Sequence, residues 1–195
     1  FSPNTNLIDP SPSNIHDIFV LTKGYYDNVI TYTKGDIDFE PAPPSSLELR
    51  NTYSSLYGAK MMSDTVVMHS GKIKLLFGNL ADSRLRAKFR VIKSPIAKLT
   101  DEQIKIKIVD LIDEYFAIDN WDFGQTFYAT ELMAVIHTQL LNEISSVVIV
   151  PTYTNNSFGS LFIIESGEDE ILQSATSIND IEIVSSFTPT ILRQR

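Results

Sequence analysis

Cysteine is absent from the 195 residues, which excludes disulfide bonds, thiol catalysis and zinc sites built from thiolates. Basic residues are also few, because 16 Lys and Arg stand against 24 Asp and Glu, a formal charge of −8. Binding to a nucleic-acid backbone depends on clustered basic side chains, so this balance disfavours nucleic acid as a partner. No apolar run approaches the roughly 18 residues that cross a bilayer, so we expect no membrane partner.

Catalytic signatures are also missing. The eight glycines are isolated and form no phosphate-binding loop. His16, His69 and His137 have no second histidine at metal-ligand spacing, and residues 157–160 lack the Gly-x-Ser-x-Gly pattern of a serine nucleophile. The acidic residues at 110–114 are typical of a solvated helix face, and those at 168–170 are typical of a solvated loop. We therefore expect no enzyme activity, cofactor, metal or small-molecule substrate.

The composition is that of an ordinary folded domain, with 43% apolar and 21% charged residues. Strand patterns and helix patterns follow one another in blocks rather than in strict alternation. This order predicts an α+β fold, in which small sheets pack with amphipathic helices in two lobes. We expect an extended arm at residues 1–14, one α+β lobe at 15–95, and a second at 96–195 with Pro95 at the boundary. The Pro-rich start at Phe1 leads us to expect the C-terminal part of a longer protein.

In the first lobe, β-branched and aromatic residues predict a strand at 15–22, and apolar spacing predicts a helix from Tyr25 to Thr33. Ser45 followed by Glu48 predicts a helix start, with the helix running through Tyr57. Strands should follow at 65–77 and 84–92. The second of these alternates apolar and basic residues, as a half-buried strand does.

In the second lobe, Thr100 and Gln103 form a capping-box pattern that predicts a helix start. Apolar residues then continue one stripe along that helix: Ile104, Ile108, Leu111, Ile112 and Tyr115. A second helix at 130–141 should bury Leu132, Val135, Ile136 and Leu140. Short strands are expected at 147–150, 161–165 and 181–184.

Two groups of residues are candidate interfaces. The first, which we call the basic strip, comprises Arg84, Arg86, Lys88 and Arg90, followed by Lys93. It should meet an acidic surface, either of this chain or of another copy, since complementary charge fixes partner and register. The second is the aromatic cluster of Trp121, Phe123, Phe127 and Tyr128 around a turn at Gly124. Such aromatics either close the local core or anchor an interface.

The stretch 104–150 carries a family resemblance. A helix leads to WDFGQTFYATEL at 121–132, with Gly124, Tyr128 and Leu132 four residues apart, then to a second helix and the strand ISSVVIV at 144–150. This arrangement resembles the C-terminal region of baseplate J-like wedge proteins of contractile-tailed, T4-type bacteriophages. The segment DIFVLTKGYY at 17–26 is similar to a strand-into-helix segment of the same group. The resemblance covers residues 4–150.

The resemblance implies a structural protein of the virion, located in the tail baseplate and assembled in the host cytoplasm. Its partners would be itself, as a homodimer or a ring of dimers, and neighbouring wedge proteins, and it would transmit baseplate rearrangement to sheath contraction. Two other functions remain open from the residues. One is a host-glycan or protein binding module of a tail protein, and the other is a non-catalytic domain of a larger enzyme.

Overall fold

The computed structural model describes residues 15–55 and 65–193, and the predicted arm at 1–14 lies outside them. The chain divides at the start of strand β3 into one unit up to residue 72 and a second from residue 73. This division differs from the boundary predicted near Pro95. Residues 73–95 belong to the second unit because they include β4 (Ala87–Lys93), the central strand of its three-stranded sheet. The predicted α+β class is confirmed.

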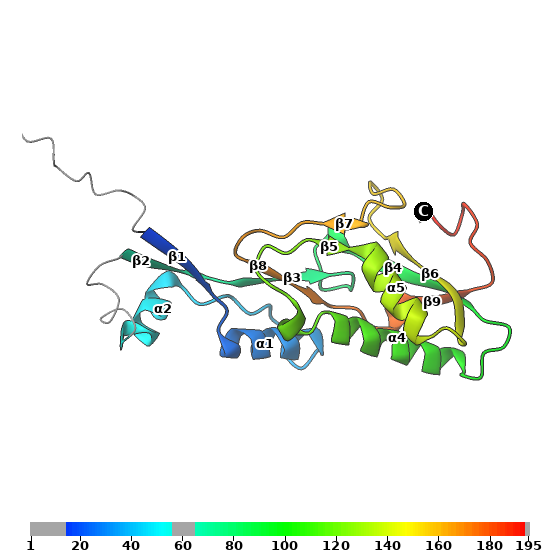
Figure 1. Ribbon diagram of the computed structural model, residues 1–195, viewed down its shortest axis with the longest axis horizontal. Helices are drawn as coiled ribbons and strands as arrows, with labels where there is room; N and C mark the ends of the chain where they lie inside the picture. Colours follow the sequence, from blue (N-terminus) through cyan, green and yellow to red (C-terminus); the bar gives the residue numbers. More distant parts are fainter. Residues whose placement is uncertain (1–14, 56–64, 194–195) are drawn as a thin grey trace, which may run out of the picture. The chain divides into compact units, whose positions relative to one another are not determined.

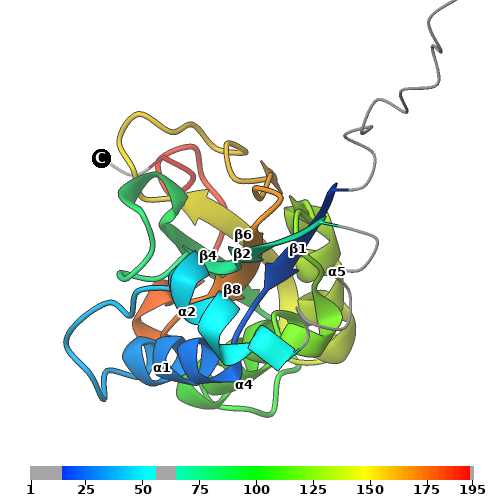
Figure 2. The same cartoon turned by 90° about the vertical axis from the view of Figure 1, so that its left-hand side faces the viewer.

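The first unit contains a two-stranded parallel sheet, in which β1 (Ile15–Val20) pairs with β2 (Thr65–Ser70) (Figure 2). Helix α1 (Lys23–Thr33) follows β1 directly, and the Thr22 hydroxyl caps it by accepting from the Tyr25 amide. Helix α2 (Ser46–Thr52) begins with the capping box that the sequence predicted between Ser45 and Glu48. The helix ends at Thr52, before the predicted Tyr57, which lies outside the described residues.

The core of the first unit is small. Leu49 of α2 and Met68 of β2 are buried against each other, and Val20 and Tyr53 pack around them. Across the two strands, His69 Nε2 lies 2.7 Å from Asp17 Oδ1, and the two side chains are 41% and 57% exposed. The strands are therefore joined by their ladder, the contact of His69 with Asp17 and a few apolar side chains.

The second unit is built on the sheet β6–β4–β9, in which β6 (Ile144–Pro151) is antiparallel and β9 (Ile181–Val184) parallel to the central β4. Two strand pairs accompany it: β3 (Lys72–Leu76) with β8 (Glu170–Ser174), and β5 (Phe127–Tyr128) with β7 (Ile163–Ile164). The alternation predicted for β4 is confirmed on one face, where the side chains are buried: Ala87, Phe89 and Val91.

Two helices cover that buried face (Figure 1). Helix α4 (Asp101–Tyr115) contacts β9 and α5, and helix α5 (Ala129–Gln139) contacts β6. The capping box at Thr100 and Gln103 is confirmed, and Ile104, Ile108 and Ile112 are fully buried. Leu111 and Tyr115 of the same stripe are half-buried. The predicted packing of the two helices as neighbours against a sheet is thus present.

Several local predictions were wrong. Residues 83–85 form a 3₁₀ turn, η2 (Ser83–Leu85), so β4 begins later than predicted. Val135 is 37% exposed, because Leu132 and Ile136 already fill the buried face of α5. Glu170 begins β8 instead of lying in a solvated loop, since it pairs with Lys74 of β3. Strand β7 covers only two of the residues expected at 161–165.

A glycine fixes the passage from β3 towards β4. A Cβ atom at Gly78 would lie only 1.6 Å from the carbonyl oxygen of Ala175. Only a residue without a side chain fits this approach of two backbone segments. The turn places the buried Phe77 ring against Phe89 of β4, with 5.2 Å between ring centroids.

Candidate functional site

The aromatic cluster lies where α4 ends and the chain reverses towards α5. Helix α4 gives way to the 3₁₀ turn η3 (Ile118–Asn120), which leads into Trp121. Gly124, around which the sequence predicted a turn, adopts a φ of +72°, a left-handed conformation that glycine tolerates. The reversal brings Phe127 back beside the end of α4, where it contacts Phe116.

Trp121 and Phe127 belong to the core of the second unit. The Trp121 ring stacks on Phe116 with 5.2 Å between centroids and 13° between planes, and its Nε1–H donates to the Tyr115 carbonyl at 2.8 Å. Phe127 is fully buried and lies 5.5 Å from the rings of both Phe77 and Phe116. The two residues therefore close the local core, which was one of the two predicted roles.

The other two members of the cluster are more accessible. Phe123 is half-buried and Tyr128 is 43% exposed. Tyr128 lies directly opposite Ile163 in the antiparallel pair of β5 and β7, and Ile163 is 59% exposed. Their chain neighbours Phe127 and Ile164 are buried. One side of this strand pair is therefore core, and the other, which we call the β5–β7 face, presents Tyr128 and Ile163 outward.

Tyr115 lies beside this cluster and is unsuited to acid–base work near neutral pH. Its hydroxyl donates to Glu131 Oε2 at 3.4 Å. Partial burial, together with the nearby Glu131 carboxylate, raises the pKa of Tyr115 to about 12. The phenol thus stays protonated and links the end of α4 to the first turn of α5.

Part of the basic strip is neutralised by acidic residues of its own unit. Lys88 Nζ lies 3.1 Å from Asp180 Oδ1, and Arg90 Nε lies 2.8 Å from Glu182 Oε2. Lys93 pairs in the same way with Asp101 of α4 at 2.7 Å. Of the two acidic surfaces predicted to meet the strip, the structure provides the one in the same chain.

The strip is also less exposed than an outward strand face suggests. Arg90 is only 9% exposed, and its Nη1 is buried without a hydrogen-bond partner among the described residues. Arg86 is half-buried and donates from Nε to the Ala81 carbonyl at 2.9 Å. Arg84 lies in the 3₁₀ turn before the strand and is exposed. Arg84 is therefore the member of the strip with the most accessible side chain.

A groove of about 600 Å³ opens at another place in the second unit, and no sequence pattern predicted it. The chain leaving β6 forms one wall and the C-terminal segment forms the other. Its lining residues are Pro151, Tyr153, Thr154, Asn156, Ser157, Phe158, Pro189, Leu192 and Arg193. The two segments lie far apart in sequence, so no local spacing could have joined them.

Among residues 15–55 and 65–193, no three acidic or histidine side chains gather where they could hold a metal ion. Within those ranges no helix is both long enough and apolar enough to cross a membrane.

The comparisons with known proteins add no family. No protein-family model matches the sequence, and no curated protein matches it.

Proposed function

We propose that the protein is a structural, non-enzymatic component of a phage tail baseplate wedge, in which copies associate with each other and with neighbouring wedge proteins. Such a protein would reside in the virion after assembly in the host cytoplasm. The proposal starts from the sequence resemblance over residues 4–150. Its work would be mechanical, because contacts between subunits would carry baseplate rearrangement to the contracting sheath.

One observation carries the proposal. The residues of the resemblance form a continuous arrangement of α4, the Gly124 turn, α5 and β6, packed through Phe116, Trp121 and Phe127. Aromatic contacts of this kind fix a helix pair rigidly, since each pair of rings adds to the apolar area that it buries. A rigid scaffold is what a load-transmitting subunit needs.

The exposure of the candidate interface residues supports one surface for the association of copies. Trp121 and Phe127 are committed to the core, and the paired members of the basic strip are neutralised. The β5–β7 face keeps two apolar side chains exposed, Tyr128 and Ile163, directly opposite each other. Tyrosine and other large apolar side chains are enriched at the centres of protein interfaces. We therefore assign self-association to this face.

Light scattering coupled to size-exclusion chromatography tests the proposal on the 195-residue chain. At tens of micromolar the wild-type chain should elute with at least twice the mass of one chain. Tyr128→Lys and Ile163→Lys should shift it towards the single-chain mass, because a charge in an apolar contact is desolvated without a partner. Leu141→Lys is the matched control, since Leu141 is 60% exposed just beyond the end of α5.

A single-chain mass for the wild type at these concentrations would contradict self-association through this chain. If the wild type assembles and both β5–β7 variants keep its mass, the contact between copies lies on another surface.

A further inference from the structure

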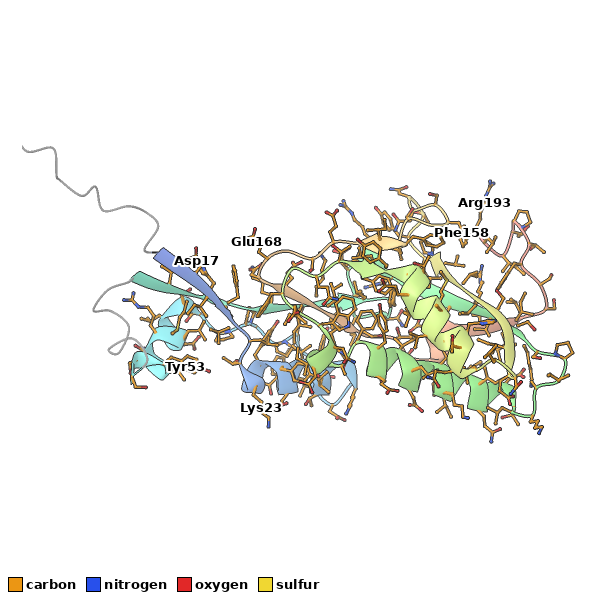
Figure 3. The ribbon with its side chains drawn as sticks, viewed as in Figure 1. Asp17, Lys23, Tyr53, Phe158, Glu168 and Arg193 are labelled. Carbon is orange, nitrogen blue, oxygen red and sulfur yellow. The ribbon has the colours of Figure 1, made fainter. Side chains whose placement is uncertain are left out.

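The groove beside the C-terminal segment has the size of a small-ligand site. Its volume of about 600 Å³ falls within the roughly 300–1,000 Å³ typical of such sites. One wall is the loop from Pro151 to Phe158, and the other is the segment from Pro189 to Arg193. Figure 3 shows Phe158 and Arg193 on the same edge of the second unit.

The apolar part of the groove is held in place. Phe158 is 41% exposed, and its ring meets Phe162 edge-on, with 5.4 Å between centroids and 76° between planes. Pro189 and Leu192 add apolar surface on the opposite wall. A fixed, half-exposed aromatic ring offers a flat surface to the C–H face of a ligand.

The polar groups of the groove retain hydrogen-bonding capacity. The Tyr153 hydroxyl accepts from Asn155 Nδ2 at 3.3 Å, so its own hydrogen remains available for donation. Asn156 donates from Nδ2 to the Arg84 carbonyl at 2.8 Å, which fixes the amide and leaves Oδ1 as an acceptor. The groove thus presents a donor and an acceptor suited to a ligand that carries hydroxyl groups.

The charge of the groove is positive in an acidic protein. Arg193 is exposed, and within the described part of the chain it has no carboxylate partner, unlike Lys88, Arg90 and Lys93. An arginine fork matches a carboxylate with two parallel hydrogen bonds. A ligand that carries a carboxylate satisfies this group.

We propose that the groove binds an acidic saccharide, a sugar unit that carries a carboxylate such as a hexuronic acid. The carboxylate pairs with Arg193, the hydroxyl groups bond to Tyr153 and Asn156, and the C–H face of the ring lies on Phe158. This inference does not depend on the assembly proposed above, because the groove and the β5–β7 face are formed by different residues.

Titration calorimetry and ligand-detected NMR on the full chain test the inference, with a disaccharide containing glucuronic acid as the probe. The matching neutral disaccharide with glucose should bind about tenfold or more weakly, since it lacks the charged hydrogen bonds. Arg193→Gln should remove that difference, and Phe158→Ala should weaken both sugars. Lys107→Gln is the matched control, because it removes one positive charge from the exposed face of α4.

Absence of binding of the acidic disaccharide at about 20 mM would overturn the inference, because weak specific binding has a dissociation constant on the millimolar scale. Equal affinity for the acidic and neutral sugars would also overturn it. So would an equal loss of affinity in Arg193→Gln and Lys107→Gln. Tighter binding of a short peptide carboxylate than of the sugar would likewise overturn the saccharide class. Because Arg193 is exposed, Arg193→Gln should unfold at the wild-type temperature, and circular dichroism verifies this before binding is measured.

Discussion

At the scale of single residues, the basic strip shows that an amino-acid pattern predicts which side chains share a strand face but not which residues they pair with. Alternation along β4 predicted that Lys88 and Arg90 share a face, and they do. Their partners Asp180 and Glu182 lie about ninety positions later and become neighbours only because β9 pairs with β4 in the register that sets Arg90 opposite Glu182. Register between distant strands depends on the whole fold, so the local pattern could not identify these partners.

Trp121→Ala should destabilise the protein strongly. The substitution removes a buried ring that stacks on Phe116 and donates a hydrogen bond to the Tyr115 carbonyl. Replacing a buried aromatic with alanine typically costs about 3–5 kcal/mol through lost contacts and the remaining cavity. Thermal unfolding followed by circular dichroism should show a much lower melting temperature.

The control for this prediction is Tyr128→Ala, seven residues further along the same segment. Tyr128 is 43% exposed, so its loss should change stability by less than about 1 kcal/mol. If both variants melted at the wild-type temperature, Trp121 would not be core, and an interface role would regain support.

Glu170→Gln should make the protein less stable at neutral pH and less sensitive to acid. Partial burial works to raise the pKa of the Glu170 carboxyl, but the Gly167 amide and the Lys74 ammonium outweigh burial, so its pKa lies below the ordinary value near 4.5. A lowered folded-state pKa contributes stability that is present above the unfolded-state pKa and is lost as pH falls through the folded-state pKa. The expected loss at pH 7 is about 1 kcal/mol.

Urea unfolding at steps between pH 7 and pH 3 measures this linkage. The difference in stability between wild type and Glu170→Gln should be constant down to about pH 5 and shrink below it. Glu168→Gln, in the exposed loop before the strand, should match the wild type at every pH. A wild-type advantage that persisted unchanged at pH 3 would show that Glu170 acts by packing and not by charge.

At the scale of elements, the success of the prediction followed the strength of local signals. Helix α4 carries a capping box, acidic residues in its first turn and a continuous apolar stripe, and all three act within the helix itself. Strand β8 has no such signal. It follows a run of acidic residues and exists because it pairs with β3, almost a hundred residues earlier, so only tertiary structure defines it.

The same contrast limits what could be predicted of the candidate sites. The turn at Gly124 was predictable, because a glycine between two helical patterns permits a positive φ. The division of the aromatic cluster was not, since Phe127 and Tyr128 differ in exposure through the pairing of β5 with β7. The groove was missed for a related reason, because its two walls meet only in the folded chain.

Ile112→Asp should unfold the second unit. Ile112 is fully buried on the face of α4 that packs in the core, so the carboxylate would be desolvated without a partner at a cost of several kcal/mol. Ile106→Asp is a matched control on the same helix, because Ile106 is 45% exposed and should tolerate the charge. Equal melting temperatures for Ile112→Asp and the wild type would mean that the register assigned to α4 is wrong.

At the scale of the whole molecule, the chain divides into two units between residues 72 and 73, where few contacts cross. Pro95 suggested a boundary because proline interrupts regular structure, and a loop does follow β4 there. The loop is internal to a unit, however, because β4 before it is hydrogen-bonded to both β6 and β9 after it. A break in local structure therefore need not be a boundary between units, which depends on where few contacts cross.

Two fragments test this division directly. A fragment of residues 72–195 keeps β3, β4 and the Phe77 ring, so it should unfold cooperatively in urea with dispersed NMR signals. A fragment of residues 96–195, cut at the boundary that Pro95 suggested, lacks the central strand and leaves β6 and β9 without their shared partner. It also exposes the apolar faces of α4 and α5, so it should be unfolded or aggregated. Cooperative unfolding of the shorter fragment alone would place the boundary at Pro95 after all, whereas failure of the longer one would show that the second unit requires residues before 72.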